Sequence, residues 1–153
     1  MKTNQGFTLV ELMLTLAVAA ILMTVAVPSF RETIMDNRLS TQSNELVTAL
    51  NYARSEAVKR HETITVTSKN GTNWEAGWTI TDPGGTNLRD HDALAGTTTI
   101  GGSASSLQYQ QTGFLTGSNS ITFSTCDSRT GETGRALTIL VSGQLSRATM
   151  TCP

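Results

Sequence analysis

Residues 6–30 read GFTLVELMLTLAVAAILMTVAVPSF, and this stretch decides the fold. From Phe7 to Phe30 the 24 residues carry a single charged side chain, that of Glu11. At about 1.5 Å per residue, a helix of that length reaches about 36 Å, which is enough to cross the hydrocarbon core of a membrane. We therefore predict a transmembrane helical segment over residues 7–30, preceded by a short polar leader, residues 1–6.

Glu11 lies about one turn into this apolar segment, where a carboxylate is unusual. A charged side chain at the centre of a bilayer costs at least about 2.5–3.5 kcal/mol, so it needs a partner of opposite charge. The natural partner is a positive charge near the start of another copy of the same helix. We predict that Glu11 is an assembly contact.

The order of the leader and the apolar segment argues against an ordinary secretory signal. Such signals place a small-residue cleavage site after the apolar stretch, whereas this leader ends in Gly6, before it. Ala17-Val18-Ala19 fits the secretory pattern but lies inside the apolar run, and Thr24-Val25-Ala26 is better placed although Pro28 follows closely. We predict cleavage after Gly6, with secretory cleavage as the alternative.

The stretch Gly6-Phe7-Thr8-Leu9-Val10-Glu11-Leu12 resembles the class III leader motif of type IV pilins and type II secretion pseudopilins. The resemblance implies that a prepilin peptidase cleaves between Gly6 and Phe7 and methylates the new amino group of Phe7. It also implies that Glu11 neutralises the amino terminus of a neighbouring subunit, and that Pro28 marks a helix kink. The implied partners are other pilin or pseudopilin subunits, the prepilin peptidase and the inner membrane.

The net charge and the length of the chain limit the possible partners and the number of domains. The formal net charge is −1, and loss of Lys2 with the leader makes it −2, so no basic excess indicates nucleic acid or anionic lipid. Lys2 precedes the span and the charges after it are mixed, which favours a cytoplasmic leader. We predict that residues 31–153 form one periplasmic domain, including the rest of the stem helix.

Apolar residues continue at helical spacing beyond the span, so we predict one helix from Phe7 to Arg60, bent near Pro28. Beyond it the pattern alternates with period two and is rich in β-branched residues. The predicted strands are residues 63–68, 74–81, 107–109, 121–124, 136–141 and 145–150, with a Gly-rich loop and one short strand before Ser106. The fold class is α+β.

Two further motifs narrow the resemblance. The strand holding Trp74-Glu75-Ala76-Gly77-Trp78, followed later by Cys126 and by Ser142-Gly143 before a closing strand, resembles the GspH/FimT/FimU minor subunits. Asn51-Tyr52-Ala53-Arg54-Ser55-Glu56-Ala57 matches the stem-end motif of the same group. The resemblance is weakest from Pro83 to Ser106. It implies a type IV pilin-like fold, in which a stem helix packs on two antiparallel sheets.

Cys126 and Cys152 are the only cysteines, and the periplasm would oxidise them. Closing a loop of this length contributes about 3–4 kcal/mol in the chain-entropy model. We predict a disulfide between them that holds the last residues of the chain. Two isolated cysteines without nearby histidines do not make a structural zinc site, which needs four ligands.

No catalytic motif is present, and we predict neither enzyme activity nor a cofactor or metal. His61 is expected at the helix end, where a ring that can carry charge suits the helix dipole. Asp90-His91-Asp92, with Asp82 nearby, offers oxygen ligands for a divalent cation, but a solvated Gly-rich loop carries such residues anyway. Trp74 and Trp78 are expected to cover the edge of the core rather than to form an exposed stacking surface.

DNA binding is a possible role, because some FimT-type minor pilins take part in DNA uptake through a Gly-Arg-x-Arg motif in the closing hairpin. The matching stretch here is Gly143-Gln144-Leu145-Ser146-Arg147, in which Gln144 replaces the first arginine. The segment between the cysteines holds three candidate DNA contacts: Arg129, Arg135 and Arg147. If they converge, they neutralise about three phosphates, which gives weak and strongly salt-dependent binding. The simpler interpretation is that these arginines are scattered over the surface and form no binding site.

Three functions therefore remain: a structural minor pilin that helps to prime a type IV pilus, a DNA-binding minor pilin for natural transformation, and a minor pseudopilin of a type II secretion system. The leader and the stem are common to the first and the third, so the sequence does not separate them.

Overall fold

The computed structural model describes residues 7–153 of the 153-residue chain. It contains two compact units, Met1–Asn37 and Arg38–Pro153. One helix, α1 (Leu9–Arg60, 52 residues), begins in the first unit and ends in the second. α1 starts two residues later than predicted, and it continues through Pro28 as a helix.

The carboxyl end of α1 is closed by a left-handed residue. His61 has φ of +56°, and the Glu62 amide donates a hydrogen bond to the Ala57 carbonyl at 3.2 Å. This is the 6→1 hydrogen bond of a Schellman cap, in which the left-handed position is usually glycine. Lys59 and Arg60 in the last turn add a favourable interaction with the negative end of the helix dipole.

Replacing His61 with Gly is expected to stabilise the protein by about 0.5–1 kcal/mol. Glycine removes the left-handed strain of about 1–2 kcal/mol, and its greater freedom in the unfolded chain offsets part of that gain. Thermal unfolding of a fragment starting at Phe30 measures the effect. His61→Ala keeps the strain and is expected to give no gain; a Gly variant less stable than the Ala variant would contradict this account of the cap.

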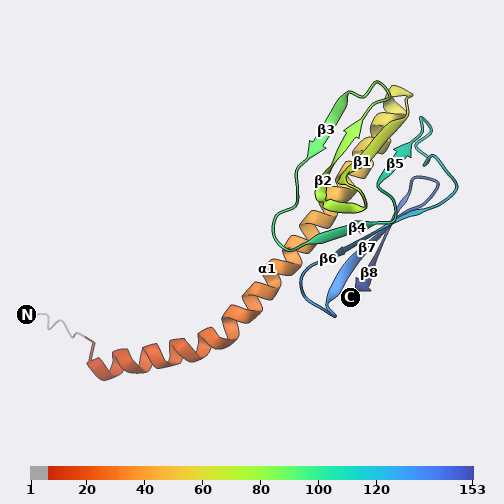
Figure 1. Ribbon diagram of the computed structural model, residues 1–153. Coiled ribbons are helices and arrows are strands. Elements are labelled where there is room, and N and C mark those ends of the chain that lie inside the picture. The colour runs from red at the N-terminus through yellow and green to blue at the C-terminus, as the bar shows by residue number, and fades with distance from the viewer. Residues whose placement is uncertain (1–6) are drawn as a thin grey trace, which may run out of the picture. The chain divides into compact units, whose positions relative to one another are not determined.

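Eight strands follow α1, and every pair between them is antiparallel. They are β1 (Ile64–Asn70), β2 (Asn73–Thr81), β3 (Asn87–His91), β4 (Thr99–Gly102), β5 (Ser106–Tyr109), β6 (Ile121–Cys126), β7 (Thr133–Ile139) and β8 (Leu145–Thr151). The strand order is β5-β1-β2-β4-β6-β7-β8, with β3 also paired to β2 (Figure 1). The α+β class and the helix-on-sheet arrangement are confirmed.

The two expected sheets are joined by hydrogen bonds into one eight-stranded sheet. β2 pairs with β1 from Asn73 to Thr81, and its second half also pairs with β3, whereas its pairing with β4 consists of the single pair Asn73–Gly101. That single register pair connects the group β1, β2, β3 and β5 to the group β4, β6, β7 and β8.

The region between Pro83 and Ser106 holds two strands, so the prediction of one short strand there was wrong. β3 has the sequence NLRDH and pairs with β2 at an edge of the sheet, and Leu88 is its one aliphatic side chain that packs against the core. Its charged residues hide the strand pattern. β4 is short and contains three residues, Thr99, Gly101 and Gly102, that contribute no apolar alternation, but Ile100 is fully buried.

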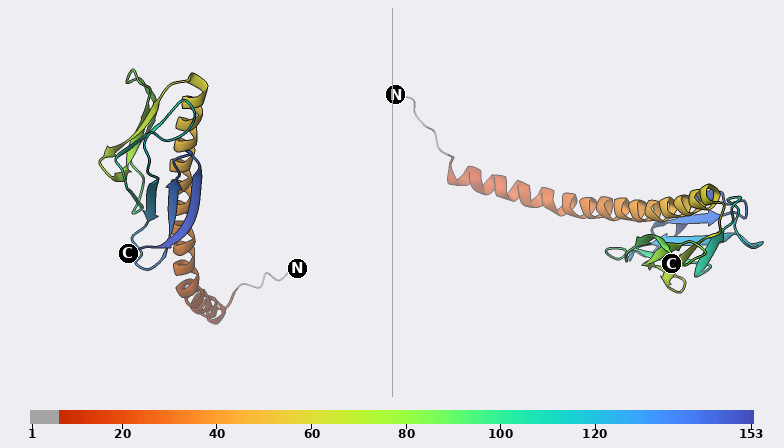
Figure 2. Two further views of the ribbon diagram at one scale, coloured as in Figure 1. Left: turned by 90° about the vertical axis from the view of Figure 1, so that its right-hand side faces the viewer. Right: turned by 90° about the horizontal axis from the view of Figure 1, so that it is seen from above.

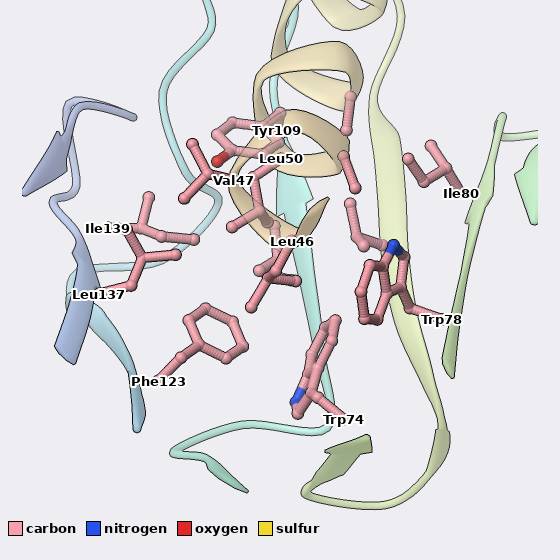
Figure 3. Close-up of a cluster of buried hydrophobic side chains, with 14 of the residues drawn as sticks. Leu46, Val47, Leu50, Trp74, Trp78, Ile80, Tyr109, Phe123, Leu137 and Ile139 are labelled. Atoms are coloured by element: carbon pink, nitrogen blue, oxygen red, sulfur yellow. The ribbon is translucent and has the colours of Figure 1, made fainter. Parts of the chain in front are cut away.

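The core lies between the sheet and the part of α1 that belongs to the second unit (Figures 2 and 3). Leu46 and Leu50 of α1 face Trp74 and Trp78 of β2 and Phe123 of β6. Trp74 and Trp78 are 0% and 1% exposed, so they lie inside the core rather than at its edge, and an exposed stacking surface is excluded. The indole of Trp74 donates to the Ala104 carbonyl at 2.9 Å, which satisfies its buried N–H.

The disulfide between Cys126 and Cys152 is present, as predicted. It connects the end of β6 to the residue that follows β8, and both cysteines are buried. Gly134 of β7 makes room for it, because a Cβ there would lie 2.9 Å from the Cys126 sulfur and 2.7 Å from the Thr125 carbonyl oxygen. The carboxyl end of the chain is thereby held against the sheet.

Candidate assembly surfaces

The amino end of α1 carries the predicted processing and assembly residues. Gly6 and the rest of the leader lie outside the described residues, whereas Phe7 is described and 84% exposed. Thr8 caps the helix: its hydroxyl accepts a hydrogen bond from the Glu11 amide at 3.2 Å. The Thr8-x-x-Glu11 spacing is that of a capping box, which is a sequence signal for the start of a helix.

The cap explains the position of Glu11 in geometric terms. Thr8 is the N-cap residue and Glu11 is the third residue of the helix, so the carboxylate lies within the first turn, near the positive end of the helix dipole. If the chain is cut after Gly6, as predicted, the new amino group of Phe7 is adjacent to this cap. Pairing of Glu11 with the amine of another subunit stays a prediction.

The first unit presents an apolar surface along α1. An 18-residue window of this helix has a mean hydropathy of 2.4, and none of the window is buried within the structure. The exposed large side chains extend from Phe7 to Ile34. By length and composition the helix is suited to cross a membrane. The kink at Pro28 stays a prediction.

In the second unit, Arg54 of the stem-end motif has a role that the sequence did not reveal. Its Nε donates to the Gly113 carbonyl at 2.9 Å, and its Nη2 donates to the Ser142 carbonyl at 3.2 Å. The backbone of Leu115 also donates to the Val141 carbonyl at 2.9 Å. Arg54 therefore holds the loop before β6 and the β7–β8 turn together against α1.

The three arginines predicted as DNA contacts do not converge on one site. The Arg129 guanidinium binds the buried carboxylate of Asp127 through Nε and Nη2, the latter at 2.7 Å. That hydrogen bond lowers the pKa of the Asp127 carboxyl, while burial opposes the shift. Arg135 and Arg147, in contrast, line one groove between α1 and the β7–β8 hairpin.

The Asp90-His91-Asp92 stretch is engaged by protein groups. The Lys69 ammonium lies 2.7 Å from Asp90 and 3.6 Å from Asp92. His91 stacks on Trp78 with ring centroids 4.0 Å apart, and its Nε2 lies 3.4 Å from a Glu45 carboxylate oxygen. Across residues 7–153, no group of three or more metal-ligating side chains is found. Asp82 accepts a hydrogen bond from the Thr86 amide in a separate turn.

Comparison with known proteins agrees with this architecture. The family model described as type II transport protein GspH matches residues 42–144, and the model of the prokaryotic N-terminal methylation motif matches residues 1–27. The chain belongs to the GspH family.

Two solved structures resemble this GspH-family protein. Both are crystal structures of the type IV minor pilin FimU of Pseudomonas aeruginosa. The first, in space group P21, has a TM-score of 0.66 and 29% identity, and the match covers 73% of this chain and 89% of that one. The second, in space group P65, has a TM-score of 0.63 and 28% identity, with 71% and 91% coverage. Among curated proteins, none is matched by this sequence.

Proposed function

We propose that this protein is a minor pilin, a structural subunit that takes part in the assembly and priming of a type IV pilus. The observation that carries the proposal is the similarity to FimU, which extends over 89% of the FimU crystal chain at 29% identity. After cleavage at Gly6, residues 7–30 anchor the subunit in the inner membrane and the domain at residues 31–153 faces the periplasm. The subunit has no enzyme activity of its own.

A minor pseudopilin of a type II secretion system is the second candidate, and the description of the matching GspH family model favours it. Deletion of the gene in the native host separates the two. We expect the deletion strain to lose most surface pili, counted by electron microscopy, and to secrete type II substrates normally. Restoration by the wild-type gene is the control. Normal piliation with a loss of secretion would assign the protein to the secretion system instead.

DNA binding during natural transformation is a third candidate, and the placement of Arg135 and Arg147 in one groove is the observation in its favour. Because Arg129 is paired with Asp127, two guanidinium groups remain rather than three. Two phosphate contacts give weak binding that salt removes.

We therefore expect no measurable binding of duplex DNA at physiological salt. At low salt, weak binding without sequence preference is expected, and Arg147→Gln should flatten the salt dependence by about one unit. A filter-binding or anisotropy titration at several salt concentrations measures both. Micromolar affinity at physiological salt that Arg147→Gln abolishes would place DNA uptake first.

A further inference from the structure

The groove between α1 and the β7–β8 hairpin has a volume of about 380 Å³ and lies wholly in the second unit. One wall is a turn of α1 that presents Ser40, Ser43 and Asn44, and the other is formed by β7 and β8. These three helix residues bring two hydroxyl groups and one amide to the groove, all of them uncharged.

The strand register places two arginines on the same wall. Leu137 pairs with Arg147, and Arg135 pairs with Thr149, so these four side chains share one face of the hairpin. Leu137 on this face is buried at the base of the groove, whereas Arg135 and Arg147 are exposed above it. The Arg135 guanidinium donates to the Ser40 hydroxyl at 3.1 Å, which turns it toward the helix.

Neither guanidinium has an acidic partner in the part of the chain that the structure describes. The ion pairs found there join Lys59, Arg60, Lys69, His91 and Arg129 to acidic groups, but neither Arg135 nor Arg147 takes part in one. Two forked donors, two hydroxyl groups and an amide around an apolar base form a recess suited to a carboxylate on a short aliphatic stem. β8 is also the edge strand of the sheet, so this wall is open to a neighbour.

We propose that this groove binds an acidic side chain of another pilin subunit, whose carboxylate lies between Arg135 and Arg147. The inference rests on the proposed function as a filament subunit. Duplex DNA fits the groove less well, because the cations are only two and lie beside a helix wall in a recess. A carboxylate with its methylene groups also uses the buried Leu137 base, whereas a phosphate backbone does not.

The test uses the full-length protein in detergent, and the probes are the other pilin subunits of its host, each purified separately. Binding is measured for the wild-type protein, Arg147→Gln and Gln144→Glu. Both substitutions change the net charge by one negative unit in the same hairpin, but Gln144 does not line the groove. Arg135→Gln is the second groove variant, and thermal unfolding establishes that each variant is folded.

We expect Arg147→Gln and Arg135→Gln each to weaken binding of at least one subunit by about tenfold or more, and Gln144→Glu to change it less than about twofold. Unchanged binding of every subunit by both arginine variants would overturn the proposal. If the two arginine variants lost binding to duplex DNA but still bound every subunit normally, the proposal would also be overturned, and the groove would be assigned to nucleic acid. If the wild-type protein bound no subunit at all, the proposed function itself would fail.

Discussion

Replacing Glu11 with Gln is expected to lower the incorporation of the mature protein into filaments by about tenfold or more, while leader cleavage continues. Glutamine keeps the shape of the side chain but removes the charge that we propose offsets the amino group of an adjoining Phe7 within the membrane. An unpaired charge there costs several kcal/mol, and each 1.4 kcal/mol corresponds to about tenfold in an equilibrium constant. The helix cap is retained, because Thr8 binds the backbone amide of residue 11 and not its side chain.

Immunoblots of sheared filaments and of whole cells measure incorporation and processing separately. Glu32→Gln is the matched control, since it makes the same chemical change on the exposed surface of α1 beyond the apolar segment. We expect this control to assemble normally. Normal incorporation of the Glu11→Gln protein would show that the carboxylate is not an assembly contact.

Replacing Gly143 with Ala is expected to destabilise the second unit by about 3 kcal/mol or more. Gly143 has φ of +75° in the β7–β8 turn, where a side chain adds about 1–2 kcal/mol of left-handed strain. A Cβ there would also overlap the Gly113 carbonyl oxygen and lie 3.0 Å from the Arg54 Nε, which donates to that same carbonyl. To remove this overlap, the loop before β6 and the β7–β8 turn, which Arg54 holds together, must move apart.

Urea unfolding of the fragment starting at Phe30, followed by the fluorescence of the buried Trp74 and Trp78, measures the loss of stability. Gly85→Ala is the control for the backbone term alone: Gly85 has a similar φ of +81°, and a Cβ there meets no atom within 4 Å. We expect this control to lose only about 1–2 kcal/mol. Equal losses in the two variants would show that the approach of the two loops contributes nothing to stability.

The architecture was largely predictable because its main signals are local. The apolar segment, the helical spacing to Arg60 and the period-two strands each follow from neighbouring residues, and the structure contains the corresponding elements. β3 was missed because its residues are mostly exposed and polar, and its place in the sheet comes from pairing with β2. The merging of the two sheets depends on the single pair Asn73–Gly101, which local pattern does not indicate.

The candidate sites were predictable to a smaller extent. The Thr8 cap was visible in the spacing of Thr8 and Glu11, whereas the role of Arg54 depends on two loops that are distant in the sequence. The sequence identifies the three arginines between the cysteines as candidates, but it does not predict which of them lie together in the folded protein. Arg129 is held by Asp127, and the strand register brings Arg135 and Arg147 to one groove.

The central claim is that the chain is processed and assembled as a pilin, and the intact mass of the protein isolated from its native host tests it most directly. The account predicts a mature chain that lacks Met1 to Gly6 and carries one added methyl group, on the amino group of Phe7. The match of the methylation motif to residues 1–27 supports this expectation. A mature chain that begins at Val27, after secretory cleavage at Ala26, would lack Glu11 and the apolar segment and would contradict the account.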